Sequence, residues 1–136
     1  MKPLLVDTNA YSAFMRGDAA VFETVAHAER LYLNAVVLGE LLGGFAAGTR
    51  EAANRAELSQ FLASPRVGLL PITADTADSY ALVYGALRRK GQPIPANDLW
   101  IAASALEHGC ALLTLDAHFR QVEGLRCGAR LADFLP

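Results

Sequence analysis

The chain has 136 residues, of which 53% are hydrophobic and 19% charged. This length and balance predict one compact domain, residues 1–136, with a buried hydrophobic core, and they exclude a disordered or fibrous chain. Twelve Lys and Arg against fourteen Asp and Glu give a formal net charge of −2. Because the bulk charge indicates neither nucleic-acid nor membrane binding, function has to be sought in local groups of residues.

The apolar segments of the chain argue against export or membrane insertion. Only three apolar residues separate Pro3 from Asp7, too few for a secretory signal. The longest apolar stretch, Leu31–Gly48, contains Glu40, whose burial in lipid would cost about 2.5 to 3.5 kcal/mol. The glycines of this stretch do not form a nucleotide-binding motif and predict close helix packing. Because no secretory signal is expected, we expect a cytoplasmic protein. The two cysteines lack CxxC spacing, so neither a disulfide framework nor a zinc site is expected.

The first half of the chain alternates short apolar runs with helical patterns. Leu4–Val6 and Leu31–Leu33 are unbroken apolar runs, as expected of strands buried on both faces of a parallel sheet. Capping residues and apolar spacing predict four helices here, namely Tyr11–Arg16, one that begins after Asp18, Ala35–Ala47 after Asn34, and Arg50–Ala63.

The second half continues the same alternation. Val67–Leu70 and Ala111–Leu115 resemble strands. The predicted helices run from Thr73 to Lys90, from Asn97 to His108, and briefly around Phe119. In the first of them, the predicted buried face is Ala77, Tyr80, Ala81, Tyr84 and Leu87. The alternation predicts an α/β fold in which helices cover both faces of a central parallel sheet.

Four acidic residues stand next to sequence that belongs to the core. Asp7 and Asp116 directly follow apolar strands, so both should lie at the carboxyl edge of the sheet, where open α/β sheets bind ligands. Glu40 interrupts an apolar helix, and Asp98 precedes the apolar run Leu99–Ala103. Crowded carboxylates raise one another's pKa, whereas a hard divalent cation favours their ionised forms. We therefore expect a shared Mg²⁺ or Mn²⁺ site, suited to phosphodiester hydrolysis.

Each acid also has an ordinary structural explanation. Asp7 can be a helix N-cap, Asp98 a first-turn acid favoured by the helix dipole, and Asp116 a turn former. Glu40 is harder to explain alone, because no Arg or Lys lies between it and Arg50. Taken together, the four acids fit a shared site better than four separate structural roles.

Four segments of the chain resemble the PIN-domain toxins of the VapC type. They are Asp7-Thr8-Asn9 after a strand, Glu40 in an apolar helix, the run Pro95–Ala103, and Thr114-Leu115-Asp116-Ala117-His118-Phe119. They occur in the family's order over residues 4–119, and the third is the most specific. The resemblance implies a three-layer α/β/α sandwich with a central parallel sheet and Mg²⁺- or Mn²⁺-dependent endoribonuclease activity. It also implies a homodimer that a small cognate antitoxin neutralises.

The resemblance carries roles onto particular residues. The implied metal ligands are Asp7, Asp98 and Asp116, with Glu40 in the same cluster as the residue that positions or deprotonates water. The implied supporting residues are Thr8, Asn9, Asn97 and Thr114. Close after the last acid, where some relatives bear a further carboxylate or amide, this chain has Ala117 and His118. The expected reaction is attack on an RNA phosphorus by a water that the metal activates.

Several cations are candidates for contacts with RNA phosphates, which supply most sequence-independent affinity. They are Arg16, Arg88, Arg89 and Lys90, with His118 as a further candidate. Solvation of helix ends is the commoner reason for such cations, and a local structural role is the commoner one for His118. Without the four site acids the formal net charge changes from −2 to +2, which favours RNA binding.

Two other functions remain open. A PIN-like module that binds RNA without cutting it would be expected to have lost part of the acidic set, and here all four acids are present. An aspartyl-phosphate phosphohydrolase would use Asp7 as its nucleophile. The second acid that it requires is replaced by Asn9, and its lysine would have to be Lys2 or Lys90.

Overall fold

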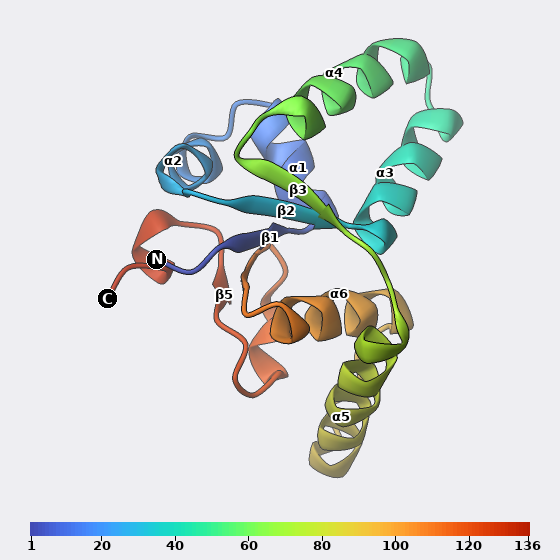
Figure 1. Ribbon diagram of the computed structural model, residues 1–136, viewed down its shortest axis with the longest axis vertical. Helices are drawn as coiled ribbons and strands as arrows, with labels where there is room; N and C mark the ends of the chain where they lie inside the picture. Colours follow the sequence, from blue (N-terminus) through green and yellow to red (C-terminus); the bar gives the residue numbers. More distant parts are fainter.

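The computed structural model describes residues 1–136 and contains a five-stranded sheet (Figure 1). The strands are β1 (Leu4–Val6), β2 (Leu31–Asn34), β3 (Val67–Leu70), β4 (Ala111–Leu113) and β5 (Cys127–Gly128). Their order is β3-β2-β1-β4-β5, and every neighbouring pair is parallel. The prediction of an α/β fold with a central parallel sheet is confirmed.

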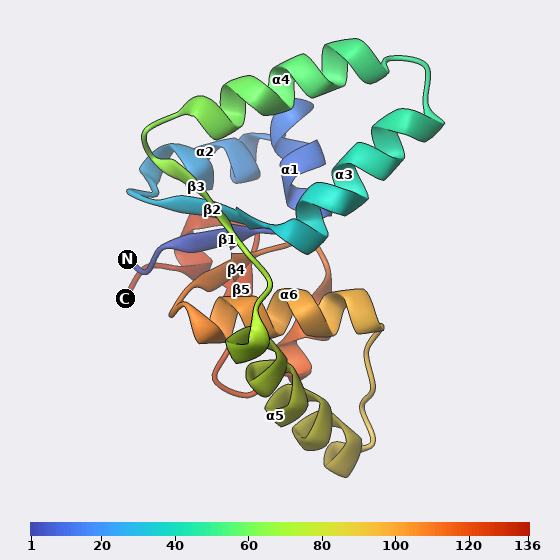
Figure 2. The same cartoon turned by 45° about the vertical axis from the view of Figure 1, so that its right-hand side comes forward.

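Helices cover both faces of this sheet. They are α1 (Thr8–Met15), α2 (Ala19–His27), α3 (Ala35–Ala47), α4 (Glu51–Ala63), α5 (Ala74–Lys90) and α6 (Ala96–Glu107), with short 3₁₀ helices η1 (Ala117–Gln121) and η2 (Leu131–Asp133). Figures 1 and 2 show α1 to α4 on one side of the sheet and α5 and α6 on the other. The result is the expected three-layer α/β/α arrangement.

The chain crosses the sheet between β3 and β4, and this crossing creates the site. From β1 the strands are added outward to β3, after which α5 and α6 carry the chain back to β4 on the other side of β1. Val6 lies opposite Leu113 in the β1–β4 pair. The residues that follow these two strands, Asp7 and Thr114, therefore emerge side by side at the point where open α/β sheets bind ligands.

The buried face of α5 differs from the predicted one. Its fully buried residues are Thr76, Val83 and Leu87, whereas Ala77, Ala81 and Tyr84 are exposed. The predicted face was right for Leu87 and for the half-buried Tyr80, but it missed Thr76 and Val83. In the structure the Thr76 hydroxyl donates to Glu107 Oε1 at 2.6 Å, so the polar group is paired and the helix turns this side inward.

The apolar stretch Leu31–Gly48 forms β2 and α3. The glycines Gly39, Gly43 and Gly44 lie on an exposed side of α3, and a Cβ built on any of them would meet no atom within 4 Å. The expectation that they allow close helix packing within the chain was wrong. No helix in the structure combines the length and apolar character that crossing a membrane requires.

Candidate active site

Asp7 lies at the carboxyl edge of the sheet, where the adjacent parallel strands β1 and β4 end; we call this place the β1–β4 crossing. Its side chain is buried, with the residue 4% exposed, and it is the N-cap of α1. Oδ1 accepts a hydrogen bond from the backbone N–H of Thr8 at 2.8 Å, and Oδ2 accepts one from Thr114 Oγ1 at 2.7 Å. The two oxygens are therefore fixed by the first residue of α1 and by the residue that follows β4.

Thr114 joins the ends of the two strands. While its hydroxyl donates to Asp7, it accepts the backbone N–H of Asp116 at 3.1 Å. The side-chain oxygen of Asn9 accepts the N–H of Leu115 at 3.0 Å. These bonds hold the turn after β4 against the start of α1, so the supporting roles expected of Asn9 and Thr114 have a geometric basis.

Glu40 reaches the same place from α3 and has two neutral partners. Oε1 accepts a hydrogen bond from Thr8 Oγ1 at 2.6 Å, and Oε2 accepts one from Asn97 Nδ2 at 2.6 Å. No ion pair involves Glu40. These donors orient both oxygens without neutralising the charge, which leaves it available to a cation or to a proton from water.

His118 lies between the two remaining acids. Its Nε2 is 2.7 Å from Asp98 Oδ2, and its Nδ1 is 2.8 Å from Asp116 Oδ1. The side chain is 32% exposed, so the ring contacts solvent at the mouth of the site. The sequence offered only an alternative between a phosphate contact and a local structural role, and gave no indication that both ring nitrogens face site acids.

The contacts form a closed ring through the site. It runs from Glu40 to Thr8, to Asp7, to Thr114, to Asp116, to His118, to Asp98, and returns through Asn97 to Glu40. Asp98 and Asn97 are neighbours in the first turn of α6. The structure therefore brings together all four predicted acids and all four supporting residues.

Burial dominates the electrostatics of two of these acids. Burial raises the pKa of Asp7, and the nearby charges of Asp98 and Glu40 add to this effect, although hydrogen bonds from Thr114 and Thr8 oppose it. Burial also raises the pKa of Asp98, against the opposing effect of His118. Holding both groups ionised at neutral pH therefore costs free energy that a bound cation would offset.

The ordinary structural roles of the acids are present beside the shared cluster. Asp7 caps α1, Asp116 caps η1 by accepting the N–H of His118 at 3.2 Å, and Asp98 lies in the first turn of α6. Capping uses one oxygen of Asp7, while the other faces Thr114. The two interpretations are thus compatible, because a cap fixes the direction of a carboxylate that also belongs to the site.

The arginines predicted to contact RNA do not gather at the acids. Arg88 and Arg89 lie exposed at the end of α5, where Arg88 donates to the Tyr84 hydroxyl at 3.3 Å. Arg16 lines a separate cavity. By contrast, Arg120 and Arg130 line a cavity of about 170 Å³ that also includes Thr114 and Asp116. Sequence analysis missed both, because only the pairing of β5 beside β4 returns Arg130 to this edge.

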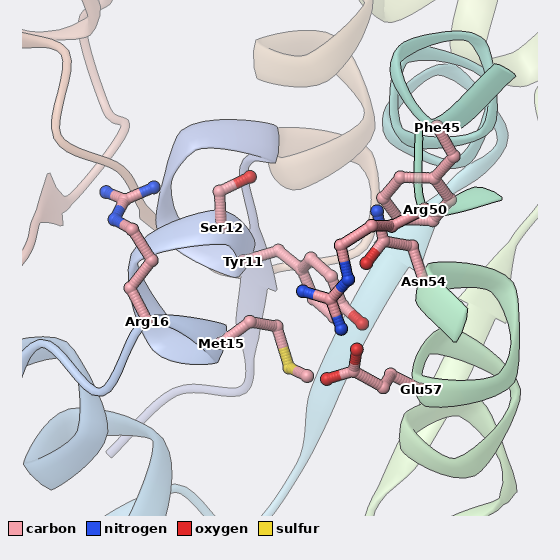
Figure 3. A pocket seen from close by; sticks show the side chains of 8 residues that line it. All are labelled: Tyr11, Ser12, Met15, Arg16, Phe45, Arg50, Asn54 and Glu57. Carbon is pink, nitrogen blue, oxygen red and sulfur yellow. The ribbon is translucent and has the colours of Figure 1, made fainter. Parts of the chain in front are cut away.

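A second concave surface runs along α1, on the side where α3 and α4 lie. One cavity of about 250 Å³ is lined by Tyr11, Ser12, Met15, Arg16, Phe45, Arg50, Asn54 and Glu57 (Figure 3). A neighbouring cavity of about 350 Å³ shares Met15 and Glu57 with it and is mainly apolar. We call the two together the α1 groove. The Tyr11 hydroxyl is buried here without a hydrogen-bond partner, and burial, with Glu57 nearby, raises the pKa of Tyr11 to about 12.

Comparison with characterised proteins gives consistent results. The model of the PIN domain family matches residues 4–125. Ribonuclease VapC1 of Rickettsia felis is 30% identical over 125 residues, which cover 90% of this chain and 92% of the relative. Ribonuclease VapC4 of Mycobacterium tuberculosis is 41% identical over 85 residues, which cover 62% of this chain and 65% of that relative.

Solved structures show the same architecture. VapBC-5 from Mycobacterium tuberculosis, a member of the VapBC family of toxin-antitoxin systems, superposes with a TM-score of 0.72 at 26% identity. The aligned part covers 94% of this chain and 97% of that one. The sequence match and the shared fold agree: the chain belongs to the PIN domain family and, within it, to the VapC ribonucleases.

Proposed function

We propose that this protein is a cytoplasmic endoribonuclease toxin that hydrolyses RNA phosphodiester bonds with Mg²⁺ or Mn²⁺ and is neutralised by a cognate antitoxin. The observation that carries the proposal is the closed ring that joins Asp7, Glu40, Asp98 and Asp116 at the β1–β4 crossing. A non-catalytic module would have no need to keep four acids linked in one cluster. The ribonuclease names of the similar VapC proteins support the same reaction class.

The donor set fits a hard divalent cation. Mg²⁺ and Mn²⁺ prefer carboxylate oxygens, and burial raises the pKa of Asp7 and Asp98, so both gain from a cation that stabilises their charged forms. Asp7, Asp98 and Asp116, with Glu40 beside them, would hold the ion. When bound, a divalent cation polarises a phosphoryl oxygen and acidifies water.

The chain's own residues prepare the remaining parts of the reaction. Glu40, oriented by Thr8 and Asn97, is the candidate to position the attacking water and accept its proton. Thr114 fixes the oxygen of Asp7 that faces the site. Arg120 and Arg130, beside Asp116, are placed to hold a neighbouring phosphate of the RNA. In-line attack on the scissile phosphorus would then follow from positioning rather than from a covalent enzyme intermediate.

A single isosteric change tests the assignment. We expect Asp98→Asn to abolish RNA cleavage while leaving the far-UV circular dichroism spectrum intact, because the change removes a ligand charge with little change in volume. EDTA should abolish cleavage of a labelled RNA by the unmodified protein, and added Mg²⁺ or Mn²⁺ should restore it. Full activity of purified Asp98→Asn would overturn the site assignment.

A matched control distinguishes the loss of a site carboxylate from the loss of any acidic charge. Asp78 lies exposed on α5 and forms no hydrogen bond or ion pair. Asp78→Asn should therefore retain full cleavage. If Asp78→Asn is as inactive as Asp98→Asn, the loss does not come from the metal site.

The antitoxin would occupy the α1 groove and extend toward the acids. The groove offers apolar surface from Phe14 and Phe61, and α1 leads from it to Thr8, a member of the site. The acids carry a negative field that an Arg on the antitoxin segment would pair with and neutralise. The VapBC structure that this fold resembles is a toxin-antitoxin assembly, which supports a partner of this kind.

Co-expression tests the partnership. We expect growth arrest when this chain is produced alone and rescue when the antitoxin encoded by the small open reading frame expected upstream is produced with it. Changing to Ala the antitoxin Arg that pairs with the site acids should weaken the rescue. Normal growth at confirmed soluble expression of the chain alone would contradict a toxin while still permitting a housekeeping nuclease. We also propose the homodimer that the resemblance to VapC toxins implies, and light scattering of the purified chain tests it.

A further inference from the structure

The geometry points to His118 as an additional ligand of the divalent cation, one that favours Mn²⁺ over Mg²⁺. This inference rests on the proposed metal-dependent function. Its basis is a set of three side chains, Asp98, Asp116 and His118, each of which offers one donor atom within 4.8 Å of the other two. The set combines two carboxylate oxygens with one imidazole nitrogen.

The position of the ring is determined by its neighbours in the fold. Asp116 caps η1 through the N–H of His118, and the next residue, Phe119, is fully buried in the core. The His118 and Phe119 rings lie with their centroids 4.8 Å apart. Because Phe119 anchors η1 in the core and Asp116 caps its first turn, both ring nitrogens of His118 face the acids, although part of the ring is exposed.

Both ring nitrogens are suitably placed for coordination. One nitrogen can bind a cation through its lone pair while the other keeps its N–H for a carboxylate, the arrangement that usually orients a metal-binding histidine. Here Nε2 faces Asp98 at 2.7 Å and Nδ1 faces Asp116 at 2.8 Å. Whichever nitrogen binds the ion, the opposite carboxylate is available to orient the ring.

A nitrogen donor changes which ion the site prefers. Mg²⁺ is hard, demands oxygen ligands and keeps several waters, whereas Mn²⁺ accepts imidazole more readily. The four carboxylates alone would not discriminate strongly between the two ions. The addition of His118 should therefore raise the ratio of Mn²⁺ affinity to Mg²⁺ affinity.

Electron paramagnetic resonance of the Mn²⁺-loaded protein tests this without measuring activity. We expect the spin-echo modulation of unmodified protein with Mn²⁺ to show coupling to an imidazole ¹⁴N, and His118→Asn and His118→Ala to lack it. Titration calorimetry should show Mn²⁺ binding weakened about tenfold or more in both variants, with a smaller change for Mg²⁺. His108→Asn is the control, because His108 lies at the far end of α6 beside Glu107.

The outcomes separate this inference from the proposed function. If Mn²⁺ binds the unmodified protein without nitrogen coupling, or equally well to His118→Asn, the ligand assignment is wrong and the acidic site stands. Tighter Mn²⁺ binding by His118→Ala would show that the ring competes with the ion, which also overturns the assignment. If the unmodified protein binds neither Mn²⁺ nor Mg²⁺, the proposed metal-dependent function itself fails.

Discussion

Asp7 is the residue at which folding and the proposed chemistry oppose each other. It is 4% exposed, and its hydrogen bonds from Thr8 and Thr114 do not cancel the effect of burial, so its pKa is raised. A buried acid with a raised pKa is a cost to the folded state when it is ionised. That cost is the signature expected of a group retained for binding a cation rather than for stability.

The raised pKa predicts how the stability of metal-free protein depends on pH. Below the ordinary value of 3.8 Asp7 is protonated in both folded and unfolded chains, so its ionisation costs nothing. As pH rises above that value the unfolded chain loses its proton first, and the free energy of unfolding falls until the folded pKa is passed. In EDTA, Asp7→Asn should therefore melt above the unmodified protein, by a margin that grows as pH rises above 3.8 and becomes constant once the raised folded pKa is passed.

Calorimetry in EDTA and in Mg²⁺ measures this margin. Bound Mg²⁺ stabilises the ionised Asp7, so it should narrow or reverse the difference. Asn can still cap α1, which keeps the comparison free of a capping loss. If Asp7→Asn is destabilised equally with and without Mg²⁺, Asp7 is a structural cap and the electrostatic argument is wrong.

Thr114 predicts a second effect at a single residue. Thr114→Val keeps the shape but removes the donor to Asp7 and the acceptor for the Asp116 N–H. We expect a loss of about 1–3 kcal/mol in the free energy of unfolding, the usual cost of unpaired buried polar groups, together with a large loss of cleavage. Thr114→Ser keeps the hydroxyl, so urea unfolding should show most of the stability retained. A larger loss in Thr114→Ser than in Thr114→Val would assign the effect to packing of the methyl group instead, because only the Val variant keeps that methyl.

At the scale of elements, α3 is an apolar helix with three glycines on an exposed side. Gly43 has no atom within 4 Å of its Cβ position, so Gly43→Ala meets no obstacle in the isolated chain. It should raise the free energy of unfolding by about 0.5–1 kcal/mol, since alanine has the higher helix propensity. Thermal unfolding measures this directly. A loss of stability in the purified chain would show that a second copy already packs against this side.

Features of the helices that local sequence determines could be predicted, and features that depend on distant residues could not. Asp18 and Asn34 cap α2 and α3, with their side chains accepting N–H groups three residues later, and both caps follow from local chemistry. Gly91 ends α5 in the left-handed conformation, as the cation-rich last turn followed by glycine predicts. The buried face of α5 followed only in part, because the burial of Thr76 depends on Glu107, a partner distant in sequence.

The same distinction applies to the site. Asp7 directly follows β1 and Asp116 comes three residues after the end of β4, so both could be predicted from the rule that parallel strands end at one edge. The position of His118 between Asp98 and Asp116 joins η1 to α6, and its spacing from Asp98 carries no periodic signal. Arg120 and Arg130 were likewise missed, since their proximity to Asp116 depends on the short strand β5.

At the scale of the whole molecule, acidic and basic side chains occupy neighbouring parts of the sheet's carboxyl edge. The acids occupy the β1–β4 crossing, and Arg120 and Arg130 line the adjoining cavity on the β5 side. No Arg in the structure lies within ion-pair distance of an acidic side chain. These two arginines are therefore free to meet phosphate, while the acids repel it unless a cation is bound, which would direct the scissile phosphate to the metal and its neighbour to the arginines.

The salt dependence of RNA binding tests this path. Each phosphate contact on single-stranded nucleic acid contributes about 0.7 to the slope of log affinity against log salt concentration. In the Asp98→Asn background, which we expect to prevent cleavage, Arg120→Ala with Arg130→Ala should lower the slope by about 1.4, measured by fluorescence anisotropy with a single-stranded RNA. Arg88→Ala with Arg89→Ala removes the same charge from the end of α5 and should leave the slope nearly unchanged. If the second pair lowers the slope and the first does not, the RNA crosses α5 instead, because a slope reports the phosphates actually contacted and not the net charge of the protein.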